Sequence, residues 1–540
     1  MPLDAARHDA ARKHKARHRP ARPRVLILCA HLHEDRARKQ DRDYLQPMVG
    51  MHAAPLIDRA RYDVSLYHDM WHGPYDTSRI APGQYELVLL TGLLMDFDRL
   101  RQLAWFFRRA GTKVVAGGSF CTLFPEAALP YFDAIAVGGV EAVVDVMRGF
   151  EAGSLGGIYR SPPGRIQSYV VDHRIFPEHG INLPLHYIEA SRGCNFKCDF
   201  CSIPAEGARH ATYLGSDVAR NIDDSIRTSP RFSARRLYPM VWFIDNNFSN
   251  NLPHLREVCR ILRDDKRVRM WGALVTQDLL RNHEVIKLMA ASKCGGLFTG
   301  IESFDPAFIA KHGKRQNEHR GGNVTDDIAH AESLGIMITY GYLFDPRMST
   351  IEQMERELRA VMNSDLLHHP YFLAFVAPLA GTKLFWDAAR GGELLPNLRL
   401  RDLDGRCIAY RNTLDGAEAL AGFARRIFGT PEVYMSRWNV IRRFVGHALR
   451  HGWRRPASLY LFVDNRSRLK RLGRKHAKDR PRTYLGGTDI LDPQYEDYPP
   501  DISDADRRMY FEPLLVTDAA GALASWLRPY APKPKSVAAA

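Results

Sequence analysis

The 540-residue sequence has few cysteines and no long apolar run, and both absences narrow its class. Its eight cysteines show no regular spacing outside one short segment, which argues against a secreted protein held together by disulfides. The basic first residues lead only into a strand-length apolar run at 25–28, whereas a membrane span needs about 20 apolar residues. We therefore expect a cytoplasmic globular protein of two or three domains.

Acidic residues are also in short supply, because 61 Asp and Glu face 76 Lys and Arg and leave a formal charge of +15. Much of the excess lies in a tail at 7–24 and in a second basic region at 442–482, which also contains aromatic residues. Such a tail is typical of a solvated, disordered arm. With no readable nucleic-acid-binding motif we expect no nucleic-acid partner, while the second region permits peripheral membrane contact.

One short segment holds three of the eight cysteines in a C-x3-C-x2-C spacing, as Cys194, Cys198 and Cys201. Cysteine sulfur suits iron, so three close thiolates can bind three irons of one [4Fe–4S] cluster and leave the fourth iron open to a small molecule. A structural zinc site is the alternative, but zinc normally takes four ligands, and the nearest fourth candidate is His210. The pattern favours the cluster.

With Phe200 just before the last cysteine, this segment resembles the signature of the radical S-adenosylmethionine (SAM) enzymes. The resemblance implies that the open iron binds SAM and that one electron cleaves its sulfonium to give a 5′-deoxyadenosyl radical. It also implies that Phe200 lies near the adenine and that an electron donor such as flavodoxin or ferredoxin serves the cluster.

Strand and helix patterns alternate six times from residue 185 and predict a partial (β/α)6 barrel over 185–396. Functional residues of such barrels lie at the carboxyl ends of the strands. By resemblance, the residues that follow the second, fourth and sixth strands contact the amino group, ribose or amino acid of SAM. They are Asp245, Asn246, Gly300, Glu302, Ser303 and Pro378.

The loop after the fifth expected strand departs from the family pattern. Relatives usually have a glycine-rich loop here, whereas this chain has Asp345 and Arg347 and no glycine over 344–350. Neither side chain can reproduce the backbone freedom of glycine, so we expect the loop to follow a different path.

An earlier alternation over 24–153 predicts a parallel, doubly wound sheet, which binds ligands at the carboxyl ends of its strands. This half resembles the cobalamin-binding domain of one large radical SAM subfamily; the alternative is a domain of the same fold that binds nothing. The resemblance implies cobalamin contacts from residues after three strands. They are Thr91, Gly92, Gly117, Gly118, Ser119, Thr122, Gly138, Gly139 and Glu141.

A loop after the first strand supplies a histidine to cobalt in many cobalamin proteins, through a D-x-H-x-x-G pattern. Here His33 falls at the histidine position, but His31 replaces the aspartate and Arg36 the glycine. Loss of the carboxylate that would orient the imidazole weakens this ligand. We therefore expect cobalamin to be held without a protein histidine on cobalt, with His33 as the alternative.

The expected organisation is thus α/β: a basic tail at 1–23, a Rossmann-like domain at 24–153, a linker at 154–184, the barrel, and a mainly helical region at 397–540 that caps the substrate. The family resemblance implies methyl transfer to an unactivated carbon of a small-molecule or lipid-like natural product. Cyclisation, ring contraction or rearrangement without methyl transfer is the alternative, and an iron–sulfur sensor or nucleic-acid-binding protein is a distant one. A methylthiotransferase would need three more upstream cysteines, and only Cys29 and Cys121 are present.

Overall fold

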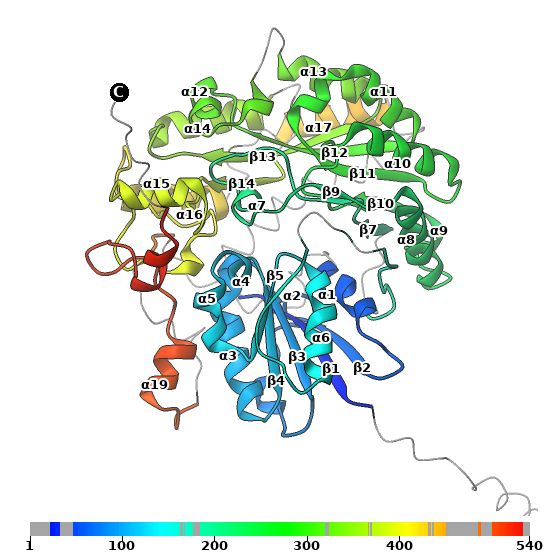
Figure 1. Ribbon diagram of the computed structural model, residues 1–540. Coiled ribbons are helices and arrows are strands. Elements are labelled where there is room, and N and C mark those ends of the chain that lie inside the picture. The colour runs from blue at the N-terminus through cyan, green and yellow to red at the C-terminus, as the bar shows by residue number, and fades with distance from the viewer. Residues whose placement is uncertain are drawn as a thin grey trace, which may run out of the picture.

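The computed structural model describes residues 22–32, 47–162, 166, 168–176, 184–318, 323–364, 367, 370–429, 434, 437–449, 484–487 and 499–532. The first 21 residues, His33 and most of the basic region at 442–482 lie outside these ranges, so the expectations about them remain predictions. Two α/β units face each other, and the carboxyl edge of the N-terminal sheet points toward the barrel (Figure 1).

The N-terminal unit is a six-stranded sheet in the order β2-β1-β3-β4-β5-β6, with every neighbouring pair parallel. Five of its strands agree with the predicted ones. The sixth lies in the stretch taken as a linker, because this short, exposed edge strand lacks the apolar run that marks the others. In chain order the strands are β1 (Arg24–Cys29), β2 (Asp63–His68), β3 (Leu87–Gly92), β4 (Lys113–Gly118), β5 (Ala134–Val137) and β6 (Gly157–Arg160).

Helices cover both faces of this sheet (Figure 1). One face carries α3 (Phe97–Arg109), α4 (Ser119–Leu123) and α5 (Pro125–Ala128), and the other carries α1 (Met48–Ala53) and α6 (Val143–Glu151). Strands buried on both sides are apolar throughout rather than alternating. This explains the continuous run of β1, in which every residue from 25 to 28 is buried.

The second unit confirms the predicted partial barrel, with six parallel strands in the order β14-β13-β12-β11-β10-β7. Between them come α8 (Gly215–Thr228), α10 (Leu252–Asp264), α11 (His283–Ala291), α12 (Pro306–Lys311), α13 (Val324–Ser333) and α14 (Ile351–Met362). The strands are β7 (Leu185–Ile188), β10 (Met240–Phe243), β11 (Met270–Val275), β12 (Cys294–Glu302), β13 (Met337–Phe344) and β14 (Phe372–Phe375).

The C-terminal region packs on both units. α15 (Lys383–Arg390) ends the barrel part of the chain, and α16 (Ala417–Gly429), α17 (Arg437–His447) and α19 (Asp504–Asp506) follow it (Figure 1). α16 packs on the barrel, where Phe423 contacts Phe344 with ring centres 5.6 Å apart. The segment after α19 packs on α3 of the N-terminal unit. Buried Arg101 on α3 donates to the carbonyl oxygens of Met509 and Glu512 at 2.6 and 2.7 Å. Arg401 pairs with Asp98 at 2.7 Å. These contacts fix the C-terminal region to the N-terminal unit.

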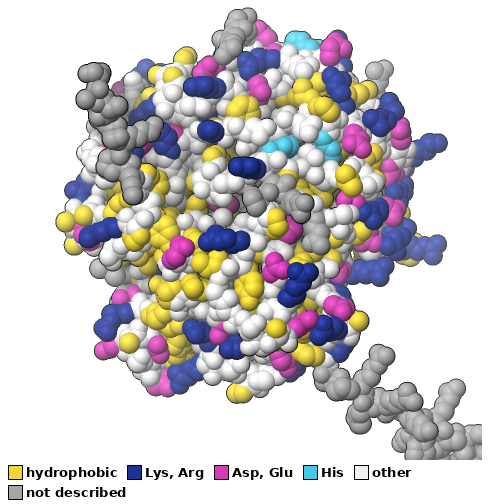
Figure 2. Space-filling view, in the orientation of Figure 1, with side chains coloured by type: hydrophobic (Ala, Val, Ile, Leu, Met, Phe, Trp, Pro, Cys, Tyr) yellow, Lys and Arg dark blue, Asp and Glu magenta, His cyan; other side chains and the backbone are white. Residues whose placement is uncertain are grey.

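The surface mixes charges of both signs. Lys and Arg side chains lie among Asp, Glu and hydrophobic side chains over the visible face (Figure 2). Within the described ranges, every helix is too short or too polar to cross a membrane.

Candidate active site

The three motif cysteines lie on the loop between β8 (Ser191–Arg192) and α7 (Ser202–Ala205), after the first barrel strand. All three are half-buried. Burial raises the pKa of Cys198, and it raises the pKa of Cys201 to about 12; the neighbouring thiols of the loop act in the same direction. Iron would bind here as it displaces their protons.

This ligand set fits a cluster. In the part of the chain that the structure describes, no three His, Cys, Asp or Glu side chains surround one point as the ligands of a single ion would. A cluster makes no such demand, because each cysteine binds its own iron. Gln316, which the sequence analysis missed, donates to the Cys198 sulfur at 3.2 Å. Hydrogen bonds to sulfur are one of the means by which proteins tune iron–sulfur clusters.

The residues after β10 anchor the cysteine loop. Gly193 has a φ of +81°, and a Cβ there would lie 2.7 Å from the Arg209 carbonyl oxygen, so only glycine fits. The Gly193 N–H donates to Asn246 Oδ1 at 2.9 Å, and its carbonyl accepts from Asn250 at 3.1 Å. Asn250 carried no motif signal.

Asp245 has partners of its own in this loop. Its carboxylate accepts from the Ala190 N–H at 2.9 Å and from the Ser191 hydroxyl at 2.6 Å. Burial raises the pKa of Asp245 to about 7. Both oxygens are therefore engaged in holding the loop base, and the contact of Asp245 and Asn246 with SAM stays a prediction.

Gly300 and Glu302, predicted to follow the fourth barrel strand, are among the last residues of β12, and their contact with SAM remains a prediction. Glu302 has a φ of +65° and sits where the pairing of β12 with β13 shifts register. Its carboxylate pairs with Lys314 at 2.7 Å, and the same ammonium donates to the Gly300 carbonyl at 2.6 Å. Lys314 Nζ is 5.9 Å from the Phe200 ring centre. The Glu302–Lys314 pair therefore lies beside Phe200, the aromatic residue of the motif. The sequence analysis did not identify Lys314. Ser303, which follows Glu302, is buried.

The P-x-x-G-T element after the sixth strand connects the cysteine loop and the N-terminal unit. Pro378 is buried, and Thr382 caps α15 by accepting from the Phe385 N–H at 3.2 Å. Two residues after Thr382, the Leu384 N–H donates to the carbonyl oxygen of Asp199 within the cysteine loop at 2.9 Å. Pro378 thus lies in a structural turn, and its contact with SAM remains a prediction.

The residues predicted to bind cobalamin gather at one edge of the N-terminal sheet, which faces the barrel (Figure 1). They end or follow the neighbouring strands β3, β4 and β5, and Thr122 accepts from the Gly138 N–H at 3.3 Å. The strands themselves are buried, whereas these glycines are partly or fully exposed. Glycines at the carboxyl ends of the strands have no side chain, so a large, flat ligand can approach the backbone there. This edge of the sheet therefore fits cobalamin.

Glu141 is engaged across the boundary between the two units. Its Oε1 accepts from Arg192 at 2.8 Å, and Arg192 directly precedes Gly193 of the cysteine loop. The same guanidinium pairs with Glu189 at 2.7 Å and donates to the hydroxyls of Tyr169 and Tyr213 at 3.0 and 2.7 Å. Arg192 therefore ties the glycine-lined edge to the cysteine loop, and a cobalamin contact for Glu141 is still only predicted.

Of the histidine pair near the first strand, the structure describes only His31. Its Nδ1 lies 3.2 Å from Asp96 Oδ1, so the ring is paired with a protein carboxylate. The role of His33 on cobalt remains a prediction, since that residue is outside the described ranges.

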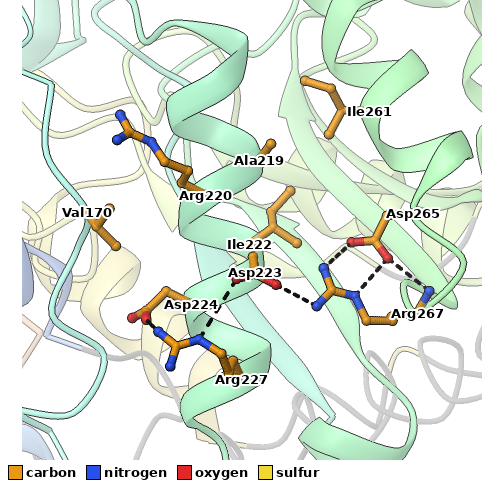
Figure 3. A pocket seen from close by; sticks show the side chains of 10 residues that line it. All are labelled: Val170, Ala219, Arg220, Ile222, Asp223, Asp224, Arg227, Ile261, Asp265 and Arg267. Carbon is orange, nitrogen blue, oxygen red and sulfur yellow. Dashed lines mark hydrogen bonds and ion pairs between the residues drawn. The ribbon is translucent and has the colours of Figure 1, made fainter.

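A hollow on the barrel's outer surface is unrelated to this site. It lies between α8, α10 and residue 170, and Arg227 and Arg267 point at the lining carboxylates, whereas Arg220 points away from them (Figure 3). Arg267 pairs with Asp223 at 2.7 Å and with Asp265 at 2.8 Å, and Arg227 pairs with Asp224 at 2.5 Å. Charges that already neutralise each other leave little to attract a charged ligand.

No family model matches the chain, but curated proteins do. It is 21% identical over 332 residues to bacteriochlorophyllide d C-8(2)-methyltransferase of Chlorobaculum tepidum, covering 57% of this chain and 70% of that protein. It is 27% identical over 186 residues to hopanoid C-3 methylase of Methylococcus capsulatus, covering 33% of this chain and 34% of that protein. The chain therefore spans only about a third of the hopanoid methylase.

Solved structures share the fold. The radical SAM methyltransferase TsrM of Kitasatospora setae has a TM-score of 0.52 at 16% identity, covering 70% of this chain and 78% of that one. The cobalamin-dependent radical SAM enzyme OxsB has a TM-score of 0.56 at 13% identity, covering 83% and 72%. With the cysteine loop, the partial barrel and the preceding six-stranded sheet in place, the chain is similar in motif and in fold to the radical SAM enzymes that carry an N-terminal cobalamin-binding domain.

Proposed function

We propose that this enzyme transfers a methyl group to an unactivated carbon of a small-molecule or lipid-like natural product. One observation carries the proposal: Arg192, which directly precedes Gly193 of the cysteine loop, pairs with Glu141 at the glycine-lined edge of the N-terminal sheet at 2.8 Å, so the two expected cofactor sites are neighbours. The named relatives support it, since bacteriochlorophyllide and hopanoid methylation are the activities that their names give. When bound, SAM on the cluster would supply a radical, and cobalamin would supply the methyl group.

The chain's own groups would hold and orient these cofactors. Three irons of the cluster would be bound by Cys194, Cys198 and Cys201. Gln316 would donate a hydrogen bond to the Cys198 sulfur. The Glu302 carboxylate, fixed by Lys314, suits a ribose diol or an ammonium group. Phe200 beside Lys314 offers an apolar ring face to a purine. The Arg192–Glu141 pair would keep the two sites at a constant separation.

Further partners are also proposed rather than observed. A small protein such as flavodoxin or ferredoxin would deliver electrons to the cluster, which requires a reducing compartment; we propose the cytoplasm. In the ranges that the structure describes, which include all eight cysteines, none of them forms a disulfide bond, in keeping with such a compartment.

We also propose that α17 contacts an anionic membrane surface from which a lipid-like substrate is drawn. Four of its large apolar side chains, at helical spacing, are exposed: Trp438 by 71%, Ile441 by 49%, Val445 by 46% and Leu449, just beyond the helix, by 75%. The sequence of α17 contains three arginines and no acidic residue. An apolar stripe accompanied by positive charge complements anionic lipid.

Vesicle sedimentation tests this surface. The full-length protein is expected to sediment with phosphatidylglycerol vesicles. The double variant Trp438→Glu with Ile441→Glu is expected to bind about tenfold more weakly or worse, because two exposed apolar side chains that would enter the lipid are lost. Phe232→Glu is the matched control, since Phe232 is 81% exposed elsewhere on the surface. Unchanged sedimentation of the double variant would refute membrane contact. So would a parent chain that is a dimer in solution while the double variant is a monomer, because the apolar stripe would then be a dimer interface.

The central test is reconstitution of the full-length protein without oxygen, using iron, sulfide and hydroxocobalamin. We expect a broad cluster absorption band, one bound cobalamin per chain and, with extracts of candidate lipids or pigments, transfer of label from methyl-labelled SAM. Formation of 5′-deoxyadenosine with no label in the product would instead favour a rearrangement. A cluster without cobalamin would contradict methyl transfer by this route.

A further inference from the structure

The loop that departs from the glycine-rich family pattern buries an acid. Asp345, directly after β13, has no exposed side-chain surface. Its Oδ1 accepts from Arg347 Nε at 2.9 Å, and its Oδ2 accepts from Arg347 Nη2 at 2.8 Å. The Arg347 guanidinium in turn lies 4.2 Å from the Tyr410 ring centre and pairs with Glu393 at 3.2 Å. The two residues that replaced glycine thus form a fixed, charged unit.

His312 joins this unit to the cysteine loop. It follows α12 and has no exposed side-chain surface. Its Nε2 lies 3.1 Å from Asp345 Oδ2, and its Nδ1 lies 2.9 Å from Asp199 Oδ1. Ionised carboxylates only accept hydrogen bonds, so a ring held between two of them donates from both nitrogens and carries a positive charge. Burial lowers the pKa of His312, but the two carboxylates outweigh burial and raise it.

Asp199 lies between Cys198 and Cys201, so this contact acts on two of the three iron-binding residues. The backbone contributes as well, since the Asp199 N–H lies 3.4 Å from the His312 carbonyl oxygen. Phe200, the next residue, meets the imidazole edge-on with ring centres 5.7 Å apart. Side chain, backbone and aromatic contacts therefore all hold this stretch against His312.

The segment that begins with His312 makes the remaining contacts to the same loop. Two residues further on, Lys314 orients Glu302, and Gln316 donates to Cys198. A single turn of chain after α12 therefore contacts the stretch from Cys198 to Phe200 from one side. His312 is the residue that fastens this turn to the strand-end loop at Asp345.

We infer that His312 is a positioning residue, whose imidazolium holds the Cys198–Cys201 stretch against Asp345 in the geometry that accepts iron before the cluster forms. With no exposed surface, His312 cannot touch a substrate, so it acts through Asp199. The inference rests on the proposed function, because it assigns a purpose to the loop only if the loop carries a cluster.

The test is the rate at which iodoacetamide modifies the loop cysteines of full-length protein purified without reconstitution, mapped by mass spectrometry. His312→Gln leaves an amide that can donate to only one carboxylate. We expect Cys198 and Cys201 to react about tenfold faster, the change that loss of one hydrogen bond to a charged group produces. His283→Gln is the matched control, because its Nε2 lies 3.2 Å from Asp327 on the surface of the barrel.

A second variant keeps the inference testable if His312→Gln folds poorly. Asp199→Asn weakens the contact of His312 with the cysteine loop and leaves the His312–Asp345 pair intact. It is therefore expected to raise the modification rates of Cys198 and Cys201, while the melting temperature stays near that of the unmodified chain. After reconstitution, both variants are expected to lose iron to a chelator faster than the His283→Gln control.

The outcomes separate the two claims. If both variants react at the unmodified rate although the parent chain forms its cluster, the positioning role is wrong and the proposed function stands. If the modification rates of Cys198 and Cys201 rise in both variants but the parent chain takes up no cluster under any reconstitution, His312 does hold the loop and the proposed function fails.

Discussion

Replacing Cys198 with alanine is expected to abolish cluster binding and, with it, all cleavage of SAM. Three cysteines are the fewest that hold a [4Fe–4S] cluster with one open iron, and two remaining thiols cannot replace the third. Cys198 is also the sulfur to which Gln316 donates at 3.2 Å, so its loss leaves that buried amide without its partner. Iron content, the visible absorption band and 5′-deoxyadenosine formation are each expected to fall to background.

Cys259→Ala is the control for this substitution. Cys259 is fully buried on α10, where burial raises its thiol pKa to about 11, and it lies outside the cysteine loop. This variant should keep full iron content and SAM cleavage, with only a modest loss of stability from the small cavity. A Cys198→Ala protein with stoichiometric iron would mean that the ligand set is different, and His210 would then be the next residue to replace.

The cysteine loop was predictable because its chemistry is local. Three sulfurs within eight residues, followed by strand–helix alternation, place the cluster ligands and the strand ends on one edge without any knowledge of distant contacts. Glu302 and Phe200 come together for this reason, as residues at the ends of different strands of one barrel. Glu302 and Phe200 are close because of the barrel topology, and the alternation of strand and helix patterns in the sequence reveals that topology.

The residues that hold the loop were not predictable, because folding alone brings them there. His312, Lys314 and Gln316 follow a six-residue helix and match no motif, yet this segment lies against a loop more than a hundred residues earlier. Arg192 stands in the motif region, but its partner Glu141 is 51 residues away. A charged residue in a sequence does not reveal which carboxylate it will meet.

The same limit applies to the C-terminal region. Trp526 and Tyr530 pack on Phe124, with ring centres 5.3 and 5.1 Å away, yet they lie in a six-residue 3₁₀ helix at Ser525–Tyr530, which is too short to show an apolar period. A sequence reveals a buried face only where several turns repeat it at a fixed spacing. A short helix can bury large aromatic residues and leave no such pattern.

Gly118→Ala is expected to destabilise the N-terminal unit by roughly 3 kcal/mol and to remove cobalamin binding. Gly118 ends β4 with a φ of +98° and a ψ of −173°, a conformation that essentially only glycine adopts. A Cβ would also overlap the carbonyl oxygen of Gly92 on the neighbouring strand, and backbone cannot move aside as a flexible side chain can. We expect the melting temperature to fall by roughly 10 °C, measured by circular dichroism.

Gly117→Ala separates the stability of this edge from its binding function. Gly117 is the neighbouring residue, has no positive φ, and a Cβ there would lie 3.4 Å from the Ala136 carbonyl oxygen. Its variant should therefore melt within a few degrees of the parent chain. If cobalamin rests on the backbone of this edge, Gly117→Ala will nonetheless bind it more weakly, because the added methyl group separates ligand from backbone. Unaltered cobalamin affinity in Gly117→Ala would move the ligand away from this strand end, whereas unaltered melting of Gly118→Ala would contradict the strain argument itself.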